Sequence, residues 1–260
     1  PPQEYRLAGA AVATALSQMV GGIVPLIYFF RENDSILRLG KTSWDGMAVV
    51  KACINGSSEF MSNVSMSFVG MLYNIQLLKY AGENGVAAYG VMMYVSLIFS
   101  AAFIGYSIGS APVISYHYGA VNHTELKGLL RKSITMIGIF GVGMVVAAEL
   151  FTVPLAQIFV GYDSSLMELT VSGFRIFAMS FVFMGFAIFG SGFFSALNDG
   201  LTSALISFLR TLVFELASIL LLPLVWGING VWMSIVVAEF MAVALMVLLL
   251  YIKRKKYHYW

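Results

Sequence analysis

Residues 7–30 read LAGAAVATALSQMVGGIVPLIYFF, and this stretch contains no charged side chain. It is longer than the roughly 20 apolar residues that an α-helix needs to cross a bilayer. Its glycines and its proline, Pro25, are residues that transmembrane helices tolerate. The stretch therefore predicts a membrane-spanning helix.

The rest of the chain has the same character. Of the 260 residues, 59% are hydrophobic and 11% are charged, and the mean hydropathy is +0.85. A soluble globular domain carries about 25% charged residues, so too few charges are present to cover a water-facing surface. The net charge of +2 gives no indication of nucleic-acid binding. We expect the lipid bilayer, and no nucleic acid, as a partner of this chain.

Seven apolar segments can be placed along the sequence, and they show no strand-like alternation. They cover about residues 7–30, 52–78, 86–114, 134–160, 171–197, 201–225 and 230–252. Each exceeds the roughly 9–11 residues of a barrel strand. Because lipid offers no partner to free backbone groups, such segments span as helices. The predicted fold class is all-α, a polytopic bundle of seven spans.

Basic residues gather in alternate connections of this predicted bundle. They are Arg31, Arg38, Lys41 and Lys51 after the first segment, Lys127, Arg131 and Lys132 after the third, and residues 253–256 in the tail. The opposite connections hold only Lys79 and Arg175. The positive-inside rule then predicts a multi-pass protein of the cell membrane, with a cytoplasmic C-terminus.

An ionisable side chain at membrane depth is costly and needs a physical reason. Glu59 lies in the second segment, within the polar stretch NGSSEFMSN at 55–63. Asn55 and Asn63 stand four residues before and after it, so all three can share one helix face. We interpret this face as a candidate site for ion coupling or substrate binding, the alternative being a glutamate wetted by lipid headgroups.

Three further carboxylates fall within predicted spans, and each is a candidate for the same roles. They are Glu149, Glu215 and Glu239. Each could instead pair with a neighbouring helix. Two arginines near span ends, Arg175 and Arg210, are expected to extend toward the headgroups.

Several classes of site are not indicated by the sequence. There is one cysteine, Cys53, and no Cys/His cluster that suggests a metal. No phosphate-binding loop, Ser/His/Asp arrangement or HExxH motif is visible. We therefore predict no enzymatic activity, no metal and no cofactor other than a coupling ion.

Several stretches, in order and spacing, resemble the multidrug and toxin extrusion (MATE) family. They are GAAVATALSQ at 9–18, NGSSEFMSN at 55–63, AGENGVAAYGVMMYV at 81–95, IGSAPVISYHYGA at 108–120, SALNDG at 195–200, and GINGVW at 227–232 with Glu239. The resemblance implies an antiporter of two six-helix lobes that exchanges H⁺ or Na⁺ for organic, often cationic, compounds by alternating access. The resemblance also implies a bacterial source and small organic molecules as substrates.

The same resemblance divides the chain into two parts. Residues 1–51 would be the last helix of an N-terminal lobe and a cytoplasmic linker, and residues 52–260 the six-helix C-terminal lobe. The sequence begins with Pro1, and we expect the missing N-terminal lobe of the same protein as its partner. Met184 stands where some members carry an acidic residue, so their ion site does not transfer here.

Two other classes of protein remain open at this point. One is a lipid-linked oligosaccharide flippase or polysaccharide exporter of related fold, which should hold more basic residues inside its cavity. The other is a membrane scaffold or channel subunit without coupled transport, which would not need carboxylates within its spans.

Overall fold

The computed structural model describes the backbone of residues 3–31 and 44–260, and the side chains of these residues except 3–8, 10, 55, 57–59 and 61–62. Throughout these ranges the regular structure is helical and no strand occurs. The chain separates into two compact units, Pro1–Met47 and Ala48–Trp260. This division lies close to the predicted one, although the assignment of the two parts to different lobes stays a prediction.

Most of the described residues of the first unit form one long helix, α1 (Gln3–Phe30), with Pro25 inside it. Its side chains are exposed from residue 11 to residue 30. A helix this apolar needs lipid or another helix around it, because water would not solvate such a surface.

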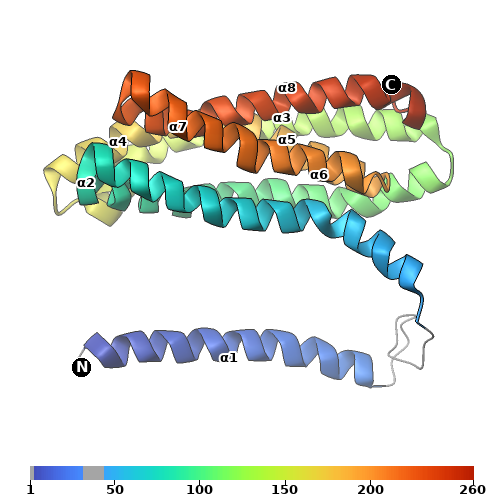
Figure 1. The fold of residues 1–260 in the computed structure, drawn as a ribbon, viewed down its shortest axis with the longest axis horizontal. Coiled ribbons are helices and arrows are strands. Elements are labelled where there is room, and N and C mark those ends of the chain that lie inside the picture. Colours follow the sequence, from blue (N-terminus) through green and yellow to red (C-terminus); the bar gives the residue numbers. More distant parts are fainter. Residues whose placement is uncertain (1–2, 32–43) are drawn as a thin grey trace. The chain divides into compact units, whose positions relative to one another are not determined.

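The second unit begins within the first turn of α2 (Gly46–Gly119), whose 74 residues are interrupted by Gly82. A straight helix of that length would measure about 110 Å, far more than a bilayer is thick. Gly82 adopts φ 64° and ψ −154°, a conformation that glycine reaches without a Cβ clash. Figure 1 shows α2 reversing its direction there, so that its two halves run side by side. The two halves correspond to the predicted segments 52–78 and 86–114.

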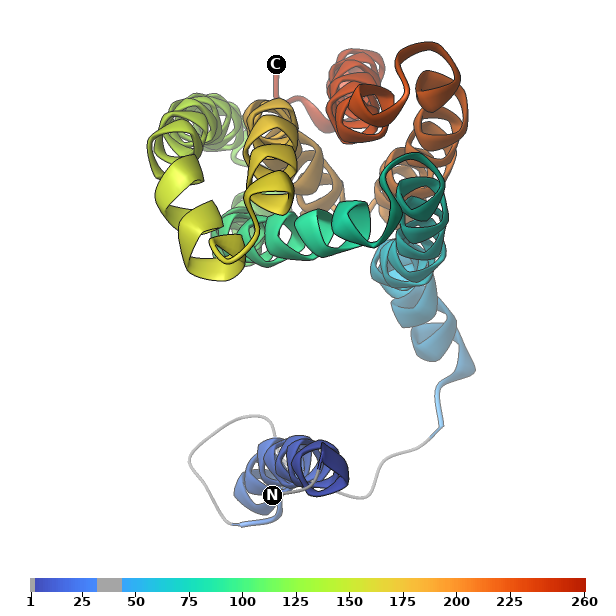
Figure 2. The same ribbon diagram turned by 90° about the vertical axis from the view of Figure 1, so that its left-hand side faces the viewer.

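The remaining helices pack against these two halves, as the end-on view in Figure 2 shows. They are α3 (His123–Val160), α4 (Ser164–Ala178), α5 (Phe181–Ala196), α6 (Gly200–Phe208), the π-helix η1 (Leu209–Phe214), α7 (Glu215–Trp226) and α8 (Ile228–Tyr257). Two of the predicted spans are not single regular helices. The segment 171–197 is bent by 48° between α4 and α5, and the segment 201–225 contains η1.

The predicted number of seven spans is not confirmed by helix length and composition alone. Five helices of the described chain are long and apolar enough to cross a membrane, or six if the bent pair α4 and α5 forms one span. The count reaches seven only when the two halves of α2 are taken separately. The all-α, polytopic character of the fold is confirmed.

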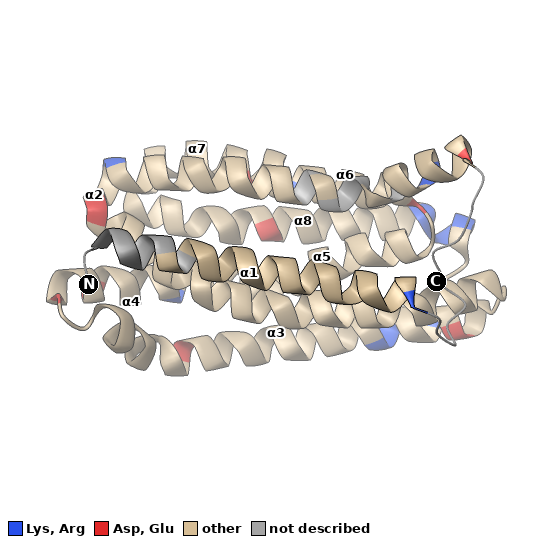
Figure 3. Cartoon of the chain, turned by 90° about the horizontal axis from the view of Figure 1, so that it is seen from below, with Lys and Arg blue, Asp and Glu red and all other residues tan. Residues whose placement is uncertain are grey.

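Contacts between aromatic side chains show which connections of the second unit lie at the same end of the bundle. At one end, the rings of His123 and His258 lie 5.0 Å apart, and Tyr118 contacts Tyr257 at 5.7 Å. The α2–α3 connection and the C-terminus therefore share one end, as the charge pattern predicts. Figure 3 shows most of the Lys and Arg residues gathered there. A cytoplasmic location of this end stays a prediction.

Tight packing holds α4 against α8 and α2. A Cβ on Gly173 would lie 2.8 Å from the Trp232 ring and 2.7 Å from Met92 Cε. Trp232 itself is almost fully buried. Close approach of this kind requires small residues, since helix association in lipid depends on van der Waals contact. The contact fixes α8, and hence Glu239, relative to α2.

Candidate functional site

The most deeply buried ion pair of the described chain joins Arg210 on η1 to Glu239 on α8. Arg210 Nε donates to Glu239 Oε1 at 3.0 Å and to Oε2 at 2.9 Å, and its Nη2 donates to Oε1 at 2.6 Å. The side chains are only 18% and 6% exposed. Glu239 lies well inside α8. The pair therefore sits within the spans, where an unpaired charge would be costly.

The π-helical turn explains how a second carboxylate reaches the same place. In an α-helix, residues five apart point in different directions, whereas a π-helix closes its turn at the fifth residue. Arg210 and Glu215 are five residues apart, across η1. Electrostatic interactions accordingly link Glu215 to Arg210 and to Glu239. π-Turns of this kind often occur at functional sites.

Glu215 differs from Glu239 in having no fixed partner. It is half-buried, and across residues 44–260 as described its carboxylate forms no hydrogen bond or ion pair. Arg210 is already engaged by Glu239 through three contacts. The two glutamates and one arginine thus carry one negative charge in excess when both carboxylates are ionised.

Two tyrosines of α2 complete this cluster. The rings of Tyr73 and Tyr89 stack 5.1 Å apart with an interplanar angle of 4°, and both interact electrostatically with Glu215. Tyr73 is 1% exposed, and its hydroxyl finds no hydrogen-bond partner in the described part of the chain. A buried hydroxyl without a partner is uncommon and calls for an explanation. We name Tyr73, Tyr89, Arg210, Glu215 and Glu239 the interior cluster.

The structure thus brings together two of the sequence-predicted site residues, Glu215 and Glu239. The expectation that Arg210 extends toward the headgroups is wrong, because its guanidinium turns inward to Glu239. Sequence spacing could not show this, because the pair joins residues 29 positions apart. The tyrosines were not predicted, since aromatic residues occur throughout the spans.

Glu149, another predicted site residue, lies apart from the interior cluster. Its Oε2 is 3.6 Å from Arg175 Nε, and the two side chains are 44% and 57% exposed. The pair joins α3 to α4. This contact matches the alternative that each carboxylate pairs with a neighbouring helix.

The predicted face around Glu59 remains a prediction. The side chains of Glu59 and Asn55 lie outside the described residues. Asn63 is exposed, and its backbone carbonyl accepts a hydrogen bond from Ser67 Oγ at 3.3 Å.

Asp199 lies directly before α6 and has several partners. It caps α6 by accepting from Thr202 N at 3.3 Å. Its Oδ2 also accepts from Tyr257 Oη at 2.7 Å and Lys253 Nζ at 3.3 Å. Burial opposes ionisation of this carboxyl, but these donors and the lysine charge outweigh burial and hold the pKa of Asp199 below its usual value.

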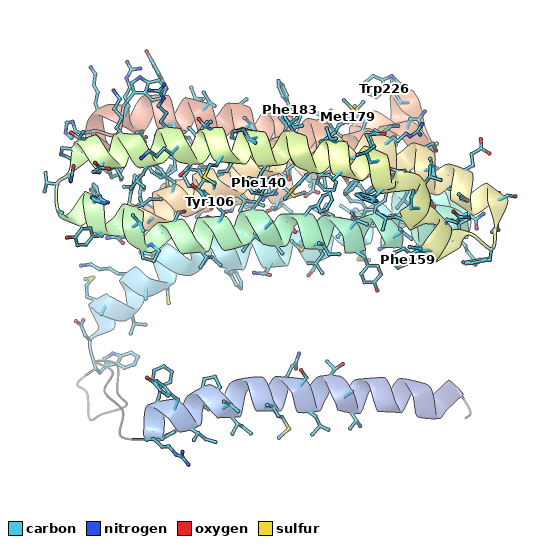
Figure 4. The ribbon with its side chains drawn as sticks, turned by 180° about the vertical axis from the view of Figure 1, so that it is seen from behind. Tyr106, Phe140, Phe159, Met179, Phe183 and Trp226 are labelled. Carbon is cyan, nitrogen blue, oxygen red and sulfur yellow. The ribbon has the colours of Figure 1, made fainter. Side chains whose placement is uncertain are left out.

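Two hollows adjoin α2. One, of about 730 Å³, is lined by Met71, Asn74, Ile75, Leu78, Glu83, Val86 and Ala87. The other, of about 180 Å³, lies between α2 and α3, and its lining includes Tyr106 and Phe140, which are labelled in Figure 4. Both walls are mainly apolar, and the larger one carries a single carboxylate.

The model of the protein family described as MatE matches residues 60–221, more than half of the chain. The chain belongs to the MatE family. Its match begins in α2 and ends in α7, so it contains Tyr73, Tyr89, Arg210 and Glu215 but not Glu239.

Curated relatives match almost the whole chain. The multidrug export protein MepA of Staphylococcus aureus (strain bovine RF122 / ET3-1) is 22% identical over 256 residues, covering 97% of this chain and 55% of the relative. The MepA protein of Staphylococcus saprophyticus is 23% identical over 257 residues, with the same coverage. The MatE chain therefore spans about half the length of these relatives.

Solved structures show the same fold. A crystal structure of MATE in the straight conformation superimposes with a TM-score of 0.86, at 22% identity, and covers 96% of this chain and 57% of its own. The outward-facing conformation of a multidrug resistance MATE family transporter of the MOP superfamily gives a TM-score of 0.85 at 22% identity, with 96% and 56% covered. At this identity the comparison establishes the MatE fold of the bundle.

Proposed function

We propose that this chain forms part of a cation-coupled multidrug efflux antiporter, which exports organic, often cationic, compounds by alternating access. Membership of the MatE family supports this proposal, as does the similarity to proteins named for multidrug export. The observation that carries it is the interior cluster, because ionisable groups inside spans are costly and mark ion or substrate pathways. The coupling ion is H⁺ or Na⁺, and we favour H⁺.

The working transporter needs more than this chain. Relatives are nearly twice as long as this chain. This length agrees with an N-terminal lobe that precedes the C-terminal lobe. Residues 1–51 would then supply the last helix of that lobe and the linker, and residues 52–260 the C-terminal lobe. Small organic substrates would bind between the lobes, with the C-terminus in the cytoplasm.

The flippase alternative is less well supported by the charges. A site for lipid-linked phosphates needs free basic groups. Arg210 is neutralised by Glu239, and Arg175 contacts Glu149 at an exposed position. Arg175 and Arg210 therefore each have a carboxylate partner already. A scaffold without transport would have no need of the interior cluster.

Transport can be tested with the full-length protein in vesicles that contain a fluorescent organic cation. We expect efflux when a pH gradient is imposed in the absence of ATP, and no efflux when the gradient is collapsed. If efflux depends on Na⁺ at fixed pH, the coupling ion is Na⁺ and not H⁺. Efflux that persists without either gradient and requires ATP would contradict the proposal.

A further inference from the structure

The interior cluster contains one carboxylate whose charge is not balanced. Arg210 donates three hydrogen bonds to Glu239, and both side chains are buried. Glu215 interacts electrostatically with both of them, yet no cation of the described chain pairs with it. Glu215, Glu239 and Arg210 together carry a charge of −1 when Glu215 is ionised and of zero when it is protonated. In a low-dielectric span, the neutral arrangement costs less.

The second observation is the unsatisfied hydroxyl of Tyr73. This hydroxyl is buried without a partner, and Tyr73 interacts electrostatically with both Glu215 and Glu239. A tyrosine hydroxyl can donate to a carboxylate that has lost its proton. The groups that face Glu215 are therefore Tyr73 and Tyr89 from α2, Arg210 from η1 and Glu239 from α8.

We propose that the Glu215 carboxylate is the exchangeable proton site of this lobe, in the interior cluster that it forms with the Arg210–Glu239 ion pair and the Tyr73–Tyr89 stack. The ion pair acts as a fixed element, since each charge already has its partner. Glu215 is the group that changes charge: its carboxylate takes one proton to become the acid, and returns that proton to water when an organic cation arrives. Tyr73 is a positioning residue that supplies a hydrogen bond to the ionised form. This proposal rests on the proposed function, because it assigns the coupled ion to a residue.

The site can be tested without measuring transport. Infrared difference spectra of the purified full-length protein, recorded without substrate as the pH is raised, should contain a protonated carboxylic acid band that disappears at a definite midpoint. We expect Glu215→Gln to lack this band. Glu149→Gln is the matched control, because Glu149 also lies in a span but is exposed, and it should keep the band. A band that persists in Glu215→Gln overturns the site, whether or not the protein transports anything.

A second measurement connects the site to the proposed function. When tetraphenylphosphonium binds to the wild-type protein in weakly buffered solution, an indicator dye should report proton release. Glu215→Gln should release about one proton fewer per bound cation, and Glu149→Gln should match the wild type. Equal release from Glu215→Gln and the wild type would overturn the site. If the wild type binds no organic cation, the proposed function fails, while the infrared band still decides about Glu215.

A third variant covers the case in which Glu215→Gln does not fold. Tyr73→Phe keeps the stacked ring and removes only the hydroxyl. Because the ionised form of Glu215 would lose a donor, the midpoint of the carboxylic acid band should move to higher pH. An unchanged midpoint would contradict the role assigned to Tyr73 and, together with a non-folding Glu215→Gln, would overturn the proposal.

Discussion

Two Arg–Glu pairs connect neighbouring helices of the bundle, and they differ in almost every physical respect. Arg210 and Glu239 make three hydrogen bonds of 2.6–3.0 Å and are 18% and 6% exposed. Arg175 and Glu149 make one contact of 3.6 Å and are 57% and 44% exposed. In the first pair, hydrogen bonds between the two side chains replace those that each ion made with water. The second pair stays largely hydrated. The same residue types therefore form a buried pair that is costly to break in one region and an exposed contact of small energetic weight in the other.

The largest expected effect comes from removing one charge of the buried pair. Glu239→Gln keeps the side-chain size but breaks the ion pair, so that no carboxylate is left in hydrogen-bond contact with the Arg210 guanidinium inside the spans. We expect a loss of about 3–5 kcal/mol in the free energy of unfolding, the range for breaking a buried pair. Thermal unfolding of the purified protein in detergent, followed by circular dichroism, measures this loss.

A double variant separates the pair from the unpaired charge. Arg210→Met combined with Glu239→Leu removes both ions and retains side-chain volume. Buried pairs replaced in this way are often as stable as before, so the double variant should be more stable than Glu239→Gln. A double variant at least as unstable as the single one would show that the pair itself, and not the stranded arginine, determines stability.

The fold was largely predictable because the hydrophobic segments are long and uninterrupted. The break at Gly82 falls within the gap predicted between residues 78 and 86. The bend between α4 and α5 was not predictable, because no proline or charge interrupts residues 176–184. Nor was the π-turn of η1, since LRTLVF at 209–214 has no distinguishing composition.

The interior cluster was only half predictable for a related reason. The sequence shows how far a residue lies from the ends of a predicted span, and this was enough to select Glu215 and Glu239. The direction in which a side chain points depends on helix rotation and on local irregularity, which the sequence does not give. Arg210 was therefore wrongly expected to extend toward the headgroups. Glu149, which is exposed, was made a candidate on the same grounds as Glu215 and Glu239 of the interior cluster.

An intermediate effect is expected at the helix ends, where Asp199 contacts Lys253 and Tyr257. The two ion-pair side chains are 9% and 30% exposed, between the values of the other pairs. Asp199→Asn should keep a cap for α6 but lose the ionic contribution. We expect a loss of about 1–2 kcal/mol at neutral pH, which is typical of a hydrogen-bonded carboxylate with partial exposure.

The pH dependence checks this assignment. The pKa of Asp199 is lower in the folded protein than its usual value of 3.8, so ionised Asp199 stabilises the fold above that pH. This contribution is lost as the pH falls through the lower, folded pKa. The difference in stability between wild type and Asp199→Asn should therefore shrink below about pH 4. A difference that stays constant from neutral to acid pH would exclude an ionic origin.

The smallest effect is expected for Glu149→Gln, the exact counterpart of Glu239→Gln in chemistry. Both changes remove one carboxylate from an Arg–Glu pair, but Arg175 is more than half exposed and can be solvated once its partner is gone. We expect the free energy of unfolding to change by about 1 kcal/mol or less. High salt should reduce even this difference, because exposed charges are screened. The measurement is the same thermal unfolding at low and high salt. A loss as large as that of Glu239→Gln would mean that lipid or the missing lobe buries the Arg175–Glu149 pair, and the contrast between the two regions would then disappear.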